Sequence, residues 1–443
     1  MSIEHQETPA PAGALERPAA EPAASRKAWL IVGLLVCLVL ANVADKIVVG
    51  LAGIDIKKDL GLDDAQLGVV QSSFFWLFAV GSVLGGWLGG KIRARWLLGG
   101  MVLLWAITMA PMVSQVGFTM LVVCRVLLGF AEGPAAALVM QVVHSWFPAH
   151  KRAVPSSIVT AGTGLGPVIA APALTWVITD YSWHAAFGVL AAAGMAFALV
   201  WMLVGDSGPE AAGKGHPSAE GTATQALPER VPLRRLFSTG TLIGTVLLFF
   251  VIQANSAIKI SWLPLYLEEG LGYDSGTIGR LVALPYLGAA ISVIVVGVFS
   301  RWLTRRGLSN RIARGVLPAS MIVLAGLATM AFSGFDRGTP HMVLLITSAS
   351  LNAAGFGVAF AGISDVVPAK QRGMVFGIVT ACFSLGGVIA PVVVGGLVAS
   401  SESAAAGYGS GFLGLGVVMV VGGAIAMLLI NPERDTARLA ARD

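Results

Sequence analysis

Long runs of apolar residues, separated by short polar segments, recur along the whole of this 443-residue chain. A helix that crosses a bilayer needs about 20 consecutive, mostly apolar residues. Twelve segments reach that length, and the pattern predicts membrane spans at residues 28–50, 67–90, 96–115, 118–143, 154–178, 184–205, 240–267, 277–300, 316–334, 340–364, 373–399 and 408–430. The sequence therefore predicts an all-α polytopic membrane protein.

The composition excludes a soluble fold. Hydrophobic residues make up 56% of the chain and charged residues only 12%, about half the charged share of an ordinary soluble domain. A soluble protein of this length could not bury so much apolar surface. The same figures exclude a disordered or fibrous chain. The net charge of +5 comes from basic residues in short clusters between apolar runs, which indicates membrane orientation and no nucleic-acid partner.

A polar stretch rich in Gly, Pro and Ser separates the first six spans from the last six, and its composition predicts a flexible linker. The N-terminal residues, rich in Pro, Ala and Glu, predict a disordered tail without the basic start or cleavage site of a signal peptide. The resulting domain prediction is a cytoplasmic tail at 1–27, an N-terminal six-helix bundle at 28–205, a cytoplasmic linker at 206–239, a C-terminal six-helix bundle at 240–430 and a cytoplasmic tail at 431–443.

Basic residues are distributed unevenly between the loops on the two sides of the membrane. Three, two, five and two Lys or Arg residues occur, in that order, in the loops at 91–95, 150–152, 301–314 and 365–372. The alternate loops carry only Lys57, Lys58, Arg280 and Arg337. Because cytoplasmic loops carry the excess of Lys and Arg, the first set is predicted to be cytoplasmic, together with both termini.

The loops that follow the second span of each half resemble each other. GGWLGGKIRAR at 85–95 and GVFSRWLTRRGLSNR at 297–311 both combine a helix end of small residues with a basic loop. Two similar six-span bundles can move about a shared axis while a binding site stays between them. The pattern therefore favours a transporter that rocks between two states.

These loops lie where the major facilitator superfamily carries its Gly-x-x-x-Asp-Arg-x-Gly-Arg-Arg signature, and the sequence resembles that superfamily. Both copies are degenerate, with Gly90 in the place of the first Asp and Arg301 in the place of the second, which weakens the charge latch associated with the motif. Within the superfamily, the chain resembles the anion:cation symporter family of galactonate, glucarate, hexuronate and phthalate carriers. The stretches that carry this resemblance are ANVADK (41–46), CRVLLGFAEGPAAA (124–137), SWFPAHKRA (145–153), TAGTGLGPVIAAP (160–172) with YSWHAAF (181–187), SWLPLYLEEGLG (261–272), ISDVVPAKQRG (363–373) and LGGVIAPVVVGG (385–396).

The resemblance implies the major facilitator fold, with twelve transmembrane helices in two six-helix halves around a central cavity. It also implies proton-coupled uptake of a small organic anion by rocker-switch alternating access, without a cofactor. That anion would be a sugar acid, an aromatic carboxylate or a dicarboxylate. The expected partners are the anion, protons and the lipid bilayer, and we expect a monomer in a bacterial inner membrane. The alternative is a proton-driven exporter of drugs or metabolites on the same fold.

Five charged residues lie inside predicted spans, where a charge is unfavourable and is functional by default. They are Asp45 and Lys46 on the first span, Arg125 and Glu132 on the fourth, and Lys259 on the seventh. Asp45 lies about 26 Å along its helix, and Arg125 and Lys259 fall near the same depth. Glu132 follows Arg125 by close to two turns, so both side chains share a face of the helix.

The resemblance associates Asp45 and Glu132 with proton coupling, and Lys46 and Arg125 with the substrate carboxylate. A physical argument supports symport. A nearby cation keeps a buried carboxylate ionised, and when a substrate anion binds that cation instead, the carboxylate can bind a proton. The structural alternative is that these charges pair only with one another to hold helices together. Related carriers commonly have Arg at the position of Lys46. A lysine ammonium is a point charge and cannot make the two parallel hydrogen bonds of a guanidinium, which indicates a different substrate.

Lys259 is the least expected of the five charges. Asn255 lies one turn before it and can share its face of the helix. One interpretation is that Lys259 supplies a second contact to the substrate anion. The other, of equal weight, is that its ammonium snorkels to the outer membrane surface.

Uncharged polar and aromatic residues complete the predicted substrate site. They are Asn42, Trp76, Phe78, Thr163, Tyr286, Asn352, Phe360, Thr380 and Ser384. Asn42 lies one turn from the charges on the first span. Asn352, Phe356 and Phe360 form a stripe at helical spacing, for which packing is the alternative to ligand contact.

No enzymatic or metal chemistry is indicated by the sequence. Cys37, Cys124 and Cys382 lie inside apolar runs and lack a metal-ligand spacing. Neither HExxH nor the phosphate loop GxxxxGK[ST] occurs, and no catalytic set of nucleophile and base shares a span depth. The sequence therefore predicts neither an enzyme nor a metal site.

Overall fold

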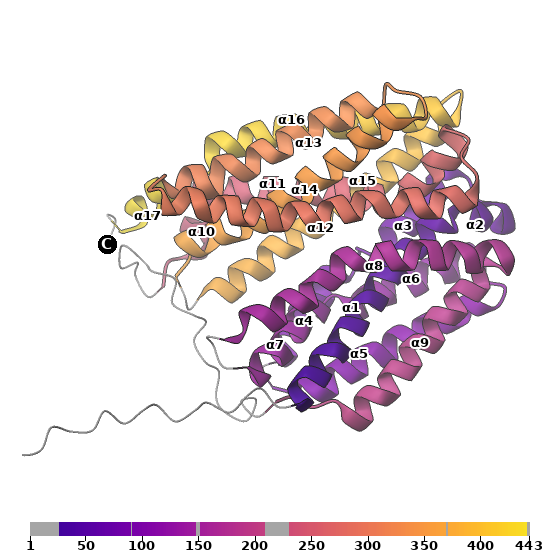
Figure 1. Ribbon diagram of the computed structural model, residues 1–443, viewed down its shortest axis with the longest axis horizontal. Helices are drawn as coiled ribbons and strands as arrows, with labels where there is room; N and C mark the ends of the chain where they lie inside the picture. The colour runs from indigo at the N-terminus through magenta and orange to yellow at the C-terminus, as the bar shows by residue number, and fades with distance from the viewer. Residues whose placement is uncertain (1–25, 90, 148–150, 209–229, 369–370, 441–443) are drawn as a thin grey trace, which may run out of the picture.

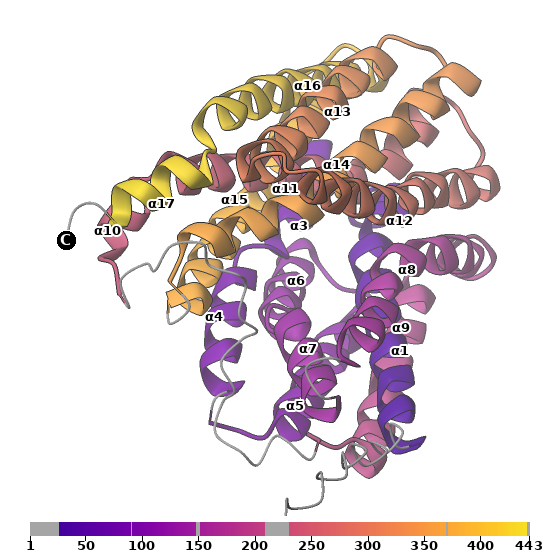
Figure 2. The same ribbon diagram turned by 60° about the vertical axis from the view of Figure 1, so that its left-hand side comes forward.

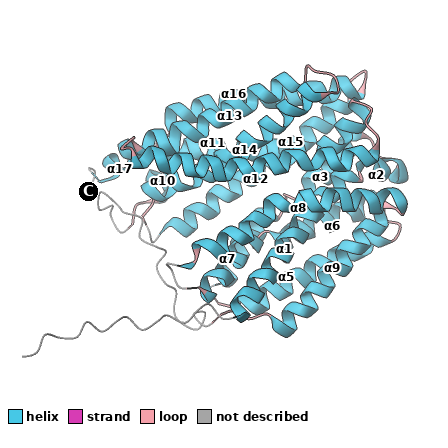
Figure 3. Ribbon diagram, viewed as in Figure 1, coloured by secondary structure: helices cyan, strands magenta, loops and turns pink. Residues whose placement is uncertain are grey.

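The structure, a computed structural model, describes residues 26–89, 91–147, 151–208, 230–368 and 371–440. Helices dominate these ranges, within which no strand occurs (Figure 1, Figure 3). Residues 1–25 of the predicted tail and 209–229 of the predicted linker lie outside the described part. The all-α fold predicted from the apolar runs is therefore confirmed.

The helices form two groups, which remain distinct in two views (Figure 1, Figure 2). The N-terminal half contains α1 (Arg26–Leu51), α2 (Gly53–Leu60), α3 (Asp64–Ser73), α4 (Phe78–Gly89), α5 (Ala94–Met109), η1 (Ala110–Val113), α6 (Phe118–Glu132), α7 (Ala135–Trp146), α8 (Ala153–Asp180) and α9 (Trp183–Val204). The C-terminal half contains α10 (Leu233–Leu236), α11 (Gly240–Leu265), η4 (Tyr266–Gly270), α12 (Ser275–Arg305), η5 (Ile312–Val316), α13 (Leu317–Phe332), α14 (Thr339–Val366), α15 (Arg372–Ala399), α16 (Ala404–Leu429) and α17 (Pro432–Ala440).

Eleven helical segments of the described residues are long and apolar enough to cross a membrane. They correspond to eleven of the twelve predicted spans. The span predicted at 340–364 forms α14, a helix of 28 residues that is not among those eleven. Large apolar side chains such as Leu203, Ile294 and Leu428 stay exposed on the helix surfaces, which is unfavourable in water but suits bilayer hydrocarbon.

Two spans that the sequence predicted as continuous, 67–90 and 118–143, are interrupted helices. A turn over residues 74–77 separates α3 from α4, and Gly133 with Pro134 separates α6 from α7. Pro134 has no N–H to donate and its ring crowds the preceding turn, which ends α6. The Gly-Pro pair carries this signal in the sequence, whereas the turn at 74–77 contains neither residue.

The two interruptions pack against each other and form what we call the helix joint. A Cβ on Gly129 would lie 1.7 Å from the carbonyl oxygen of Phe74, and one on Gly133 would lie 2.3 Å from that of Phe78. Only glycine permits such an approach of two backbones. Ser82 Oγ donates a hydrogen bond of 2.6 Å to the Gly133 carbonyl, which satisfies a group that the interruption leaves free.

The two halves contact each other mainly at the end of the molecule that carries α2, which we call the α2 end (Figure 1). The opposite end carries α17 and the start of α1, and we call it the α17 end. Helix α3 packs on α15 and α8 packs on α12 across the boundary. Gln71 Nε2 donates to the Ser261 carbonyl at 2.9 Å, so polar contacts also join the halves there.

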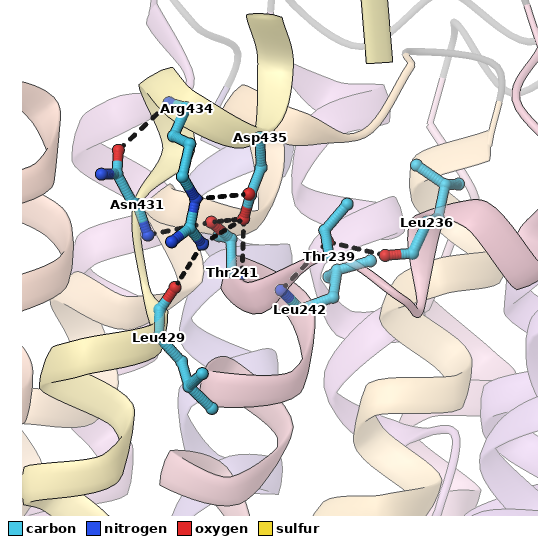
Figure 4. A network of polar contacts seen from close by, with 8 residues as sticks. All are labelled: Leu236, Thr239, Thr241, Leu242, Leu429, Asn431, Arg434 and Asp435. Carbon is cyan, nitrogen blue, oxygen red and sulfur yellow. Dashed lines mark hydrogen bonds and ion pairs between the residues drawn. The ribbon is translucent and has the colours of Figure 1, made fainter. Parts of the chain in front are cut away.

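At the α17 end, α17 docks onto the first turn of α11 (Figure 4). The Asp435 carboxylate accepts hydrogen bonds from the backbone N–H and the hydroxyl of Thr241, both at 2.7 Å. Arg434 Nε lies 2.9 Å from Asp435 Oδ1. Because the first N–H groups of a helix have no partner within it, Asp435 caps α11 from outside, within the predicted tail at 431–443.

Candidate functional site

Four of the five charges predicted inside spans meet between α1 and α6. Asp45 and Lys46 come from α1, and Arg125 and Glu132 come from α6. Asp45, Arg125 and Glu132 are 0%, 3% and 1% exposed, whereas the Lys46 side chain is 22% exposed. The spacing of Arg125 and Glu132 turns both toward α1, as helical periodicity requires. We call these four residues the charge cluster.

Lys46 and Glu132 form a salt bridge, with Nζ 2.7 Å from Oε2. Asn42, one turn before Lys46, completes this contact. Its Nδ2 donates to Glu132 Oε2 at 2.7 Å, and its Oδ1 accepts from Lys46 Nζ at 2.5 Å. The three side chains therefore form a closed set of charge-assisted hydrogen bonds, in which Asn42 holds both ions in place.

Arg125 and Asp45 are arranged differently. Arg125 Nη1 lies 3.4 Å from the backbone carbonyl oxygen of Asp45. Among the described residues, both carboxylate oxygens of Asp45, Arg125 Nε and Glu132 Oε1 are buried without a hydrogen-bond partner. Asp45 interacts electrostatically with Lys46 and Arg125, and its carboxyl group lies within hydrogen-bond reach of that of Glu132. Buried polar atoms are almost always paired, and a proton on one of the two acids would pair these oxygens with each other.

An aromatic ring lies against both cations of the cluster. Phe74, in the turn between α3 and α4, is 1% exposed. Its ring centroid lies 4.9 Å from Arg125 Cζ and 5.6 Å from Lys46 Nζ, and such cation–π contacts contribute about 0.5–2 kcal/mol each. Sequence reasoning missed Phe74, because a phenylalanine in an apolar run carries no signal of its own.

Lys259 does not join the charge cluster. It is 6% exposed, and its Nζ donates to Ser348 Oγ on α14 at 2.7 Å. Ser348 in turn lies 2.6 Å from Thr329 Oγ1 on α13, so the lysine extends into the interior of the C-terminal half. This burial does not match a snorkelling ammonium, which reaches water. In this arrangement Lys259 points toward α13 and α14, and its predicted contact with the substrate stays a prediction.

The uncharged candidates of the N-terminal half differ in their relation to the cluster. Phe78 borders it indirectly, with its ring centroid 5.7 Å from that of Phe74. Trp76 is 45% exposed, and its indole N–H donates to Ser72 Oγ at 3.2 Å. Thr163 on α8 is exposed and donates to a carbonyl one turn earlier at 2.7 Å. The last two therefore satisfy their polar hydrogens locally.

The candidates of the C-terminal half are distributed over α12, α14 and α15. Asn352 Nδ2 donates to Ser256 Oγ on α11 at 3.1 Å. Ser384 Oγ donates to the Thr380 carbonyl at 3.0 Å. Tyr286 on α12 has a buried hydroxyl without a hydrogen-bond partner in the described part of the chain.

The predicted aromatic stripe on α14 is only partly described. The ring centroid of Phe356 lies 5.3 Å from that of Phe249 and 5.6 Å from that of Phe383, which agrees with the packing alternative. The side chain of Phe360 lies outside the described residues. Asn352, at the start of the stripe, is bonded to α11 and retains one oxygen without a partner among them.

Lys57 on α2 links the two halves at the α2 end. Its Nζ lies 2.5 Å from Asp64 Oδ1 and 3.0 Å from Glu269 Oε1, and the Tyr408 hydroxyl donates to Glu269 Oε2 at 2.8 Å. Burial alone would lower the pKa of Lys57, but the hydrogen bonds to Asp64 and Glu269 outweigh it, so the pKa is raised. Sequence reasoning missed this network, because its members lie on different elements far apart in the chain.

The charge cluster, with the Asn42 amide and the Phe74 ring beside it, places two cations and two carboxylates together. Cations can bind a carboxylate, and buried acids can exchange protons when a neighbouring charge changes. No group of three or more His, Cys, Asp or Glu side chains within the described ranges could hold a metal ion. The arrangement is therefore suited to reversible binding of an anion and of protons.

Comparison with known families agrees with this architecture. The family model of the Major Facilitator Superfamily matches residues 34–361 and 306–443. The chain is 24% identical over 403 residues to a probable galactarate/D-glucarate transporter of Bacillus subtilis, with 85% of this chain and 86% of that protein covered. It is 26% identical over 433 residues to a D-galactonate transporter of Escherichia coli, with 93% and 97% covered. A hexuronate transporter of Bacillus subtilis is 25% identical over 363 residues, with 81% and 85% covered.

Solved structures share the fold. A bacterial homologue of the human lysosomal transporter Spinster, in an inward-facing and occupied conformation, superposes with a TM-score of 0.76 at 17% identity, covering 94% of this chain and 99% of that one. A D-xylose–proton symporter gives a TM-score of 0.72 at 15% identity, with 92% and 98% covered. At these identities the likeness concerns the arrangement of helices.

Proposed function

The chain belongs to the major facilitator superfamily, and from this premise we propose that it is a secondary active transporter, which takes up a small organic anion by symport with protons. A sugar acid is the leading substrate class, with aromatic carboxylates and dicarboxylates as the other candidates. The names of the relatives, which are transporters of galactarate or glucarate, galactonate and hexuronate, support the first of these classes. The proposed setting is a bacterial inner membrane, with a monomer whose two termini are cytoplasmic.

One observation carries the proposal: buried acids lie beside two cations and retain oxygens without a partner among the described residues. In a cluster that served only to hold helices together each acid would be paired with a cation, because an uncompensated buried charge is strongly destabilising. Asp45 instead lies within hydrogen-bond reach of a second acid, Glu132. Lys46 and Arg125 supply the positive charge for a carboxylate. Asp45 and Glu132 supply positions for protons.

Coupling follows from competition for Lys46. In the structure its ammonium is bound to Glu132 and Asn42. A substrate carboxylate that draws Lys46 away leaves Glu132 without its cation in a surrounding that disfavours charge, so Glu132 takes up a proton. Anion and proton then bind together. If two protons accompany a monovalent anion, the net positive charge gains about 2.3 kcal/mol from a membrane potential of 100 mV.

A thermal-shift screen of the purified protein against organic acids tests the substrate class. A ligand at 100 times its Kd adds about 2.7 kcal/mol to the stability of the folded state, so a true substrate raises the melting temperature. The shift should disappear in Arg125→Ala and persist in Arg280→Ala, which removes an exposed arginine of α12. A shift that survives undiminished in Arg125→Ala contradicts the proposed anion site.

Transport in proteoliposomes tests the coupling and the direction. We expect external substrate to stimulate proton uptake when a proton gradient is imposed. Substrate uptake that is indifferent to the proton gradient contradicts symport. Proton-driven extrusion of a lipophilic cation by the same preparation would instead identify the exporter on this fold.

A further inference from the structure

One lysine side chain, that of Lys259, lies enclosed in the C-terminal half, outside the charge cluster. The Lys259 ammonium is bonded to Ser348, and no carboxylate of the described residues lies close enough to interact with it electrostatically. The acids whose side chains are not described belong to the tails and the linker, apart from Asp365. Asp365 lies about 26 Å along α14 from Ser348. Burying a charge without a counter-charge is strongly unfavourable, so a buried lysine either gives up its proton or binds an anion.

The hydroxyl groups beside Lys259 do not compensate its charge. Thr329 Oγ1 donates to the Ala325 carbonyl at 2.8 Å, so the hydrogen between Thr329 and Ser348 comes from Ser348. Ser348 therefore accepts from Lys259, and the chain of hydrogen bonds ends at a neutral carbonyl. An ammonium has three hydrogens to donate, and two of them have no acceptor within the described part of the protein.

Asn255 supplies a second, independent observation at the same place. It lies one turn before Lys259 on α11, so the two side chains share a helix face. It is 0% exposed, and neither its Nδ2 nor its Oδ1 has a hydrogen-bond partner among the described residues. Buried amides are almost always paired, so an orphaned amide beside an uncompensated ammonium points to a ligand with negative charge.

We propose that Lys259 and Asn255 form, between α11, α13 and α14, a binding site for one small inorganic anion of the size of chloride. The ammonium supplies the charge and two N–H donors, and the Asn255 Nδ2 supplies a further donor. An organic anion does not fit the description, because Thr329 and Ser348 are 0% exposed and the core closes around them. Water alone would supply hydrogen bonds but no charge. The site is separate from the charge cluster and is independent of the proposed function.

Melting temperatures of the purified full-length protein test the proposal, with sodium chloride replaced by sodium gluconate at constant ionic strength. The wild type should show a saturable rise with chloride. Lys259→Met keeps the length of the side chain and removes the charge, and its response to chloride should be lost. Lys58→Met, which removes an exposed lysine of α2, should respond as the wild type does. A wild type that melts equally in chloride and gluconate overturns the proposal, as does a Lys259→Met variant that keeps the response.

A bromide derivative of the wild type gives a readout that does not depend on any variant folding. We expect an anomalous peak beside Lys259 Nζ and Asn255 Nδ2. Density for water alone at that position overturns the proposal, and so does a peak only beside Arg125 and Lys46, which would place the halide in the substrate site. Arg125→Ala separates the two ideas: it should lose the shift caused by an organic acid and keep the shift caused by chloride.

Discussion

The two halves of the molecule treat buried charge in opposite ways. In the N-terminal half, two cations and two acids meet between α1 and α6, and the Lys46 side chain is 22% exposed. In the C-terminal half, Lys259 is the single charge of its surroundings within the described residues and is 6% exposed. Charges that can exchange partners suit a site that binds and releases a substrate. An enclosed lone charge suits an ion that stays bound.

The backbone around these charges also differs: the helices are continuous at Lys259 and interrupted beside the charge cluster. Helices α11 and α14 run without interruption past Lys259 and Ser348. In the N-terminal half, Glu132 is the last residue of α6 and Phe74 lies in the turn before α4, so the charge cluster borders the helix joint. Helix ends absorb changes of backbone angle more readily than continuous helices do. We infer that a change of charge at Glu132 acts on the helix joint.

We expect the greatest loss of transport from removing the acid that Lys46 binds. Glu132→Gln keeps the shape of the side chain and can still accept from Asn42, but it cannot ionise. Losing one coupled proton removes about 2.3 kcal/mol of driving force at a membrane potential of 100 mV. Proton-driven accumulation of substrate should therefore fall by about 50-fold, measured as uptake in proteoliposomes with an imposed proton gradient and membrane potential.

The control is Glu402→Gln, which neutralises an exposed acid of the C-terminal half. Its accumulation should equal that of the wild type. Exchange of labelled for unlabelled substrate needs no net proton movement, and we expect Glu132→Gln to retain it. Concentrative uptake at the wild-type rate in Glu132→Gln is incompatible with the assignment of coupling to the N-terminal half.

Substitutions of Lys46 should change the affinity for the substrate. Lys46→Met removes a charged hydrogen bond to the substrate carboxylate, worth about 1.5–3 kcal/mol, so the Kd should rise by roughly 10- to 100-fold. Lys46→Arg keeps the charge but presents a planar fork, and should alter the preference among acids more than the affinity. Both effects are measured by titrating the substrate-induced shift in melting temperature. A Lys259→Met variant that weakened affinity as strongly as Lys46→Met would show that the two halves share one site.

Much of the charge cluster could be predicted from the sequence. Asp45, Lys46, Arg125 and Glu132 stand out because they interrupt apolar runs, and helical periodicity placed the last two on one face. Asn42 followed from its position one turn before Lys46. These inferences use only local spacing, which a helix converts directly into geometry.

Local spacing could predict neither the helix joint nor the side chains that surround Lys259. Spacing places Lys259 inside a span, but whether it faces the cluster or the interior of the C-terminal half depends on how α11 packs. Its partner Ser348 is 89 residues away in the sequence. The turn that contains Phe74 has no Gly or Pro that would predict it. It packs closely against Gly129, so it depends on a contact between helices and not on local sequence preference.

The Lys57 network tests whether the contact between the halves is a gate. Lys57→Ala removes both ion pairs at the α2 end, and an ion pair of this kind contributes about 1 kcal/mol, which corresponds to a population shift of about fivefold. Spin labels at Lys58 and Arg280, both exposed and on opposite halves, should report a larger fraction of long distances. Tyr408→Phe, which keeps both ion pairs, should cause a smaller shift.

The pH dependence of the same distances follows from the raised pKa of Lys57. A group whose pKa is raised by folding stabilises the closed contact fully below its ordinary pKa of 10.5 and loses that contribution as the pH rises through the raised value. The distance distribution attributable to Lys57 should therefore stay constant between about pH 6 and pH 9. If the distances lengthen between pH 6 and pH 9 in the wild type but not in Lys57→Ala, the predicted direction of the pH dependence is wrong.

The smallest expected effect concerns α17, which belongs to the C-terminal half alone. Asp435→Ala removes the acceptor for the Thr241 N–H and hydroxyl (Figure 4), and losing such a cap costs about 1 kcal/mol. The melting temperature should fall slightly, and the substrate-induced shift should be unchanged, because the charge cluster lies in the other half. Glu433→Gln, at an exposed position of the same helix, is the matched control and should melt as the wild type does.

The pH dependence of that effect has the opposite sign to that of Lys57. Burial alone would raise the pKa of Asp435, but hydrogen bonds from Arg434 and Thr241 outweigh it, and the pKa is lowered. The carboxylate therefore contributes stability above its ordinary pKa of 3.8, and this contribution is lost as the pH falls through the lowered value. The difference in melting temperature between wild type and Asp435→Ala should be constant near neutral pH and should narrow in acid. A loss of substrate binding in Asp435→Ala would instead show that the α17 end communicates with the charge cluster, and that the two halves are less independent than their buried charges indicate.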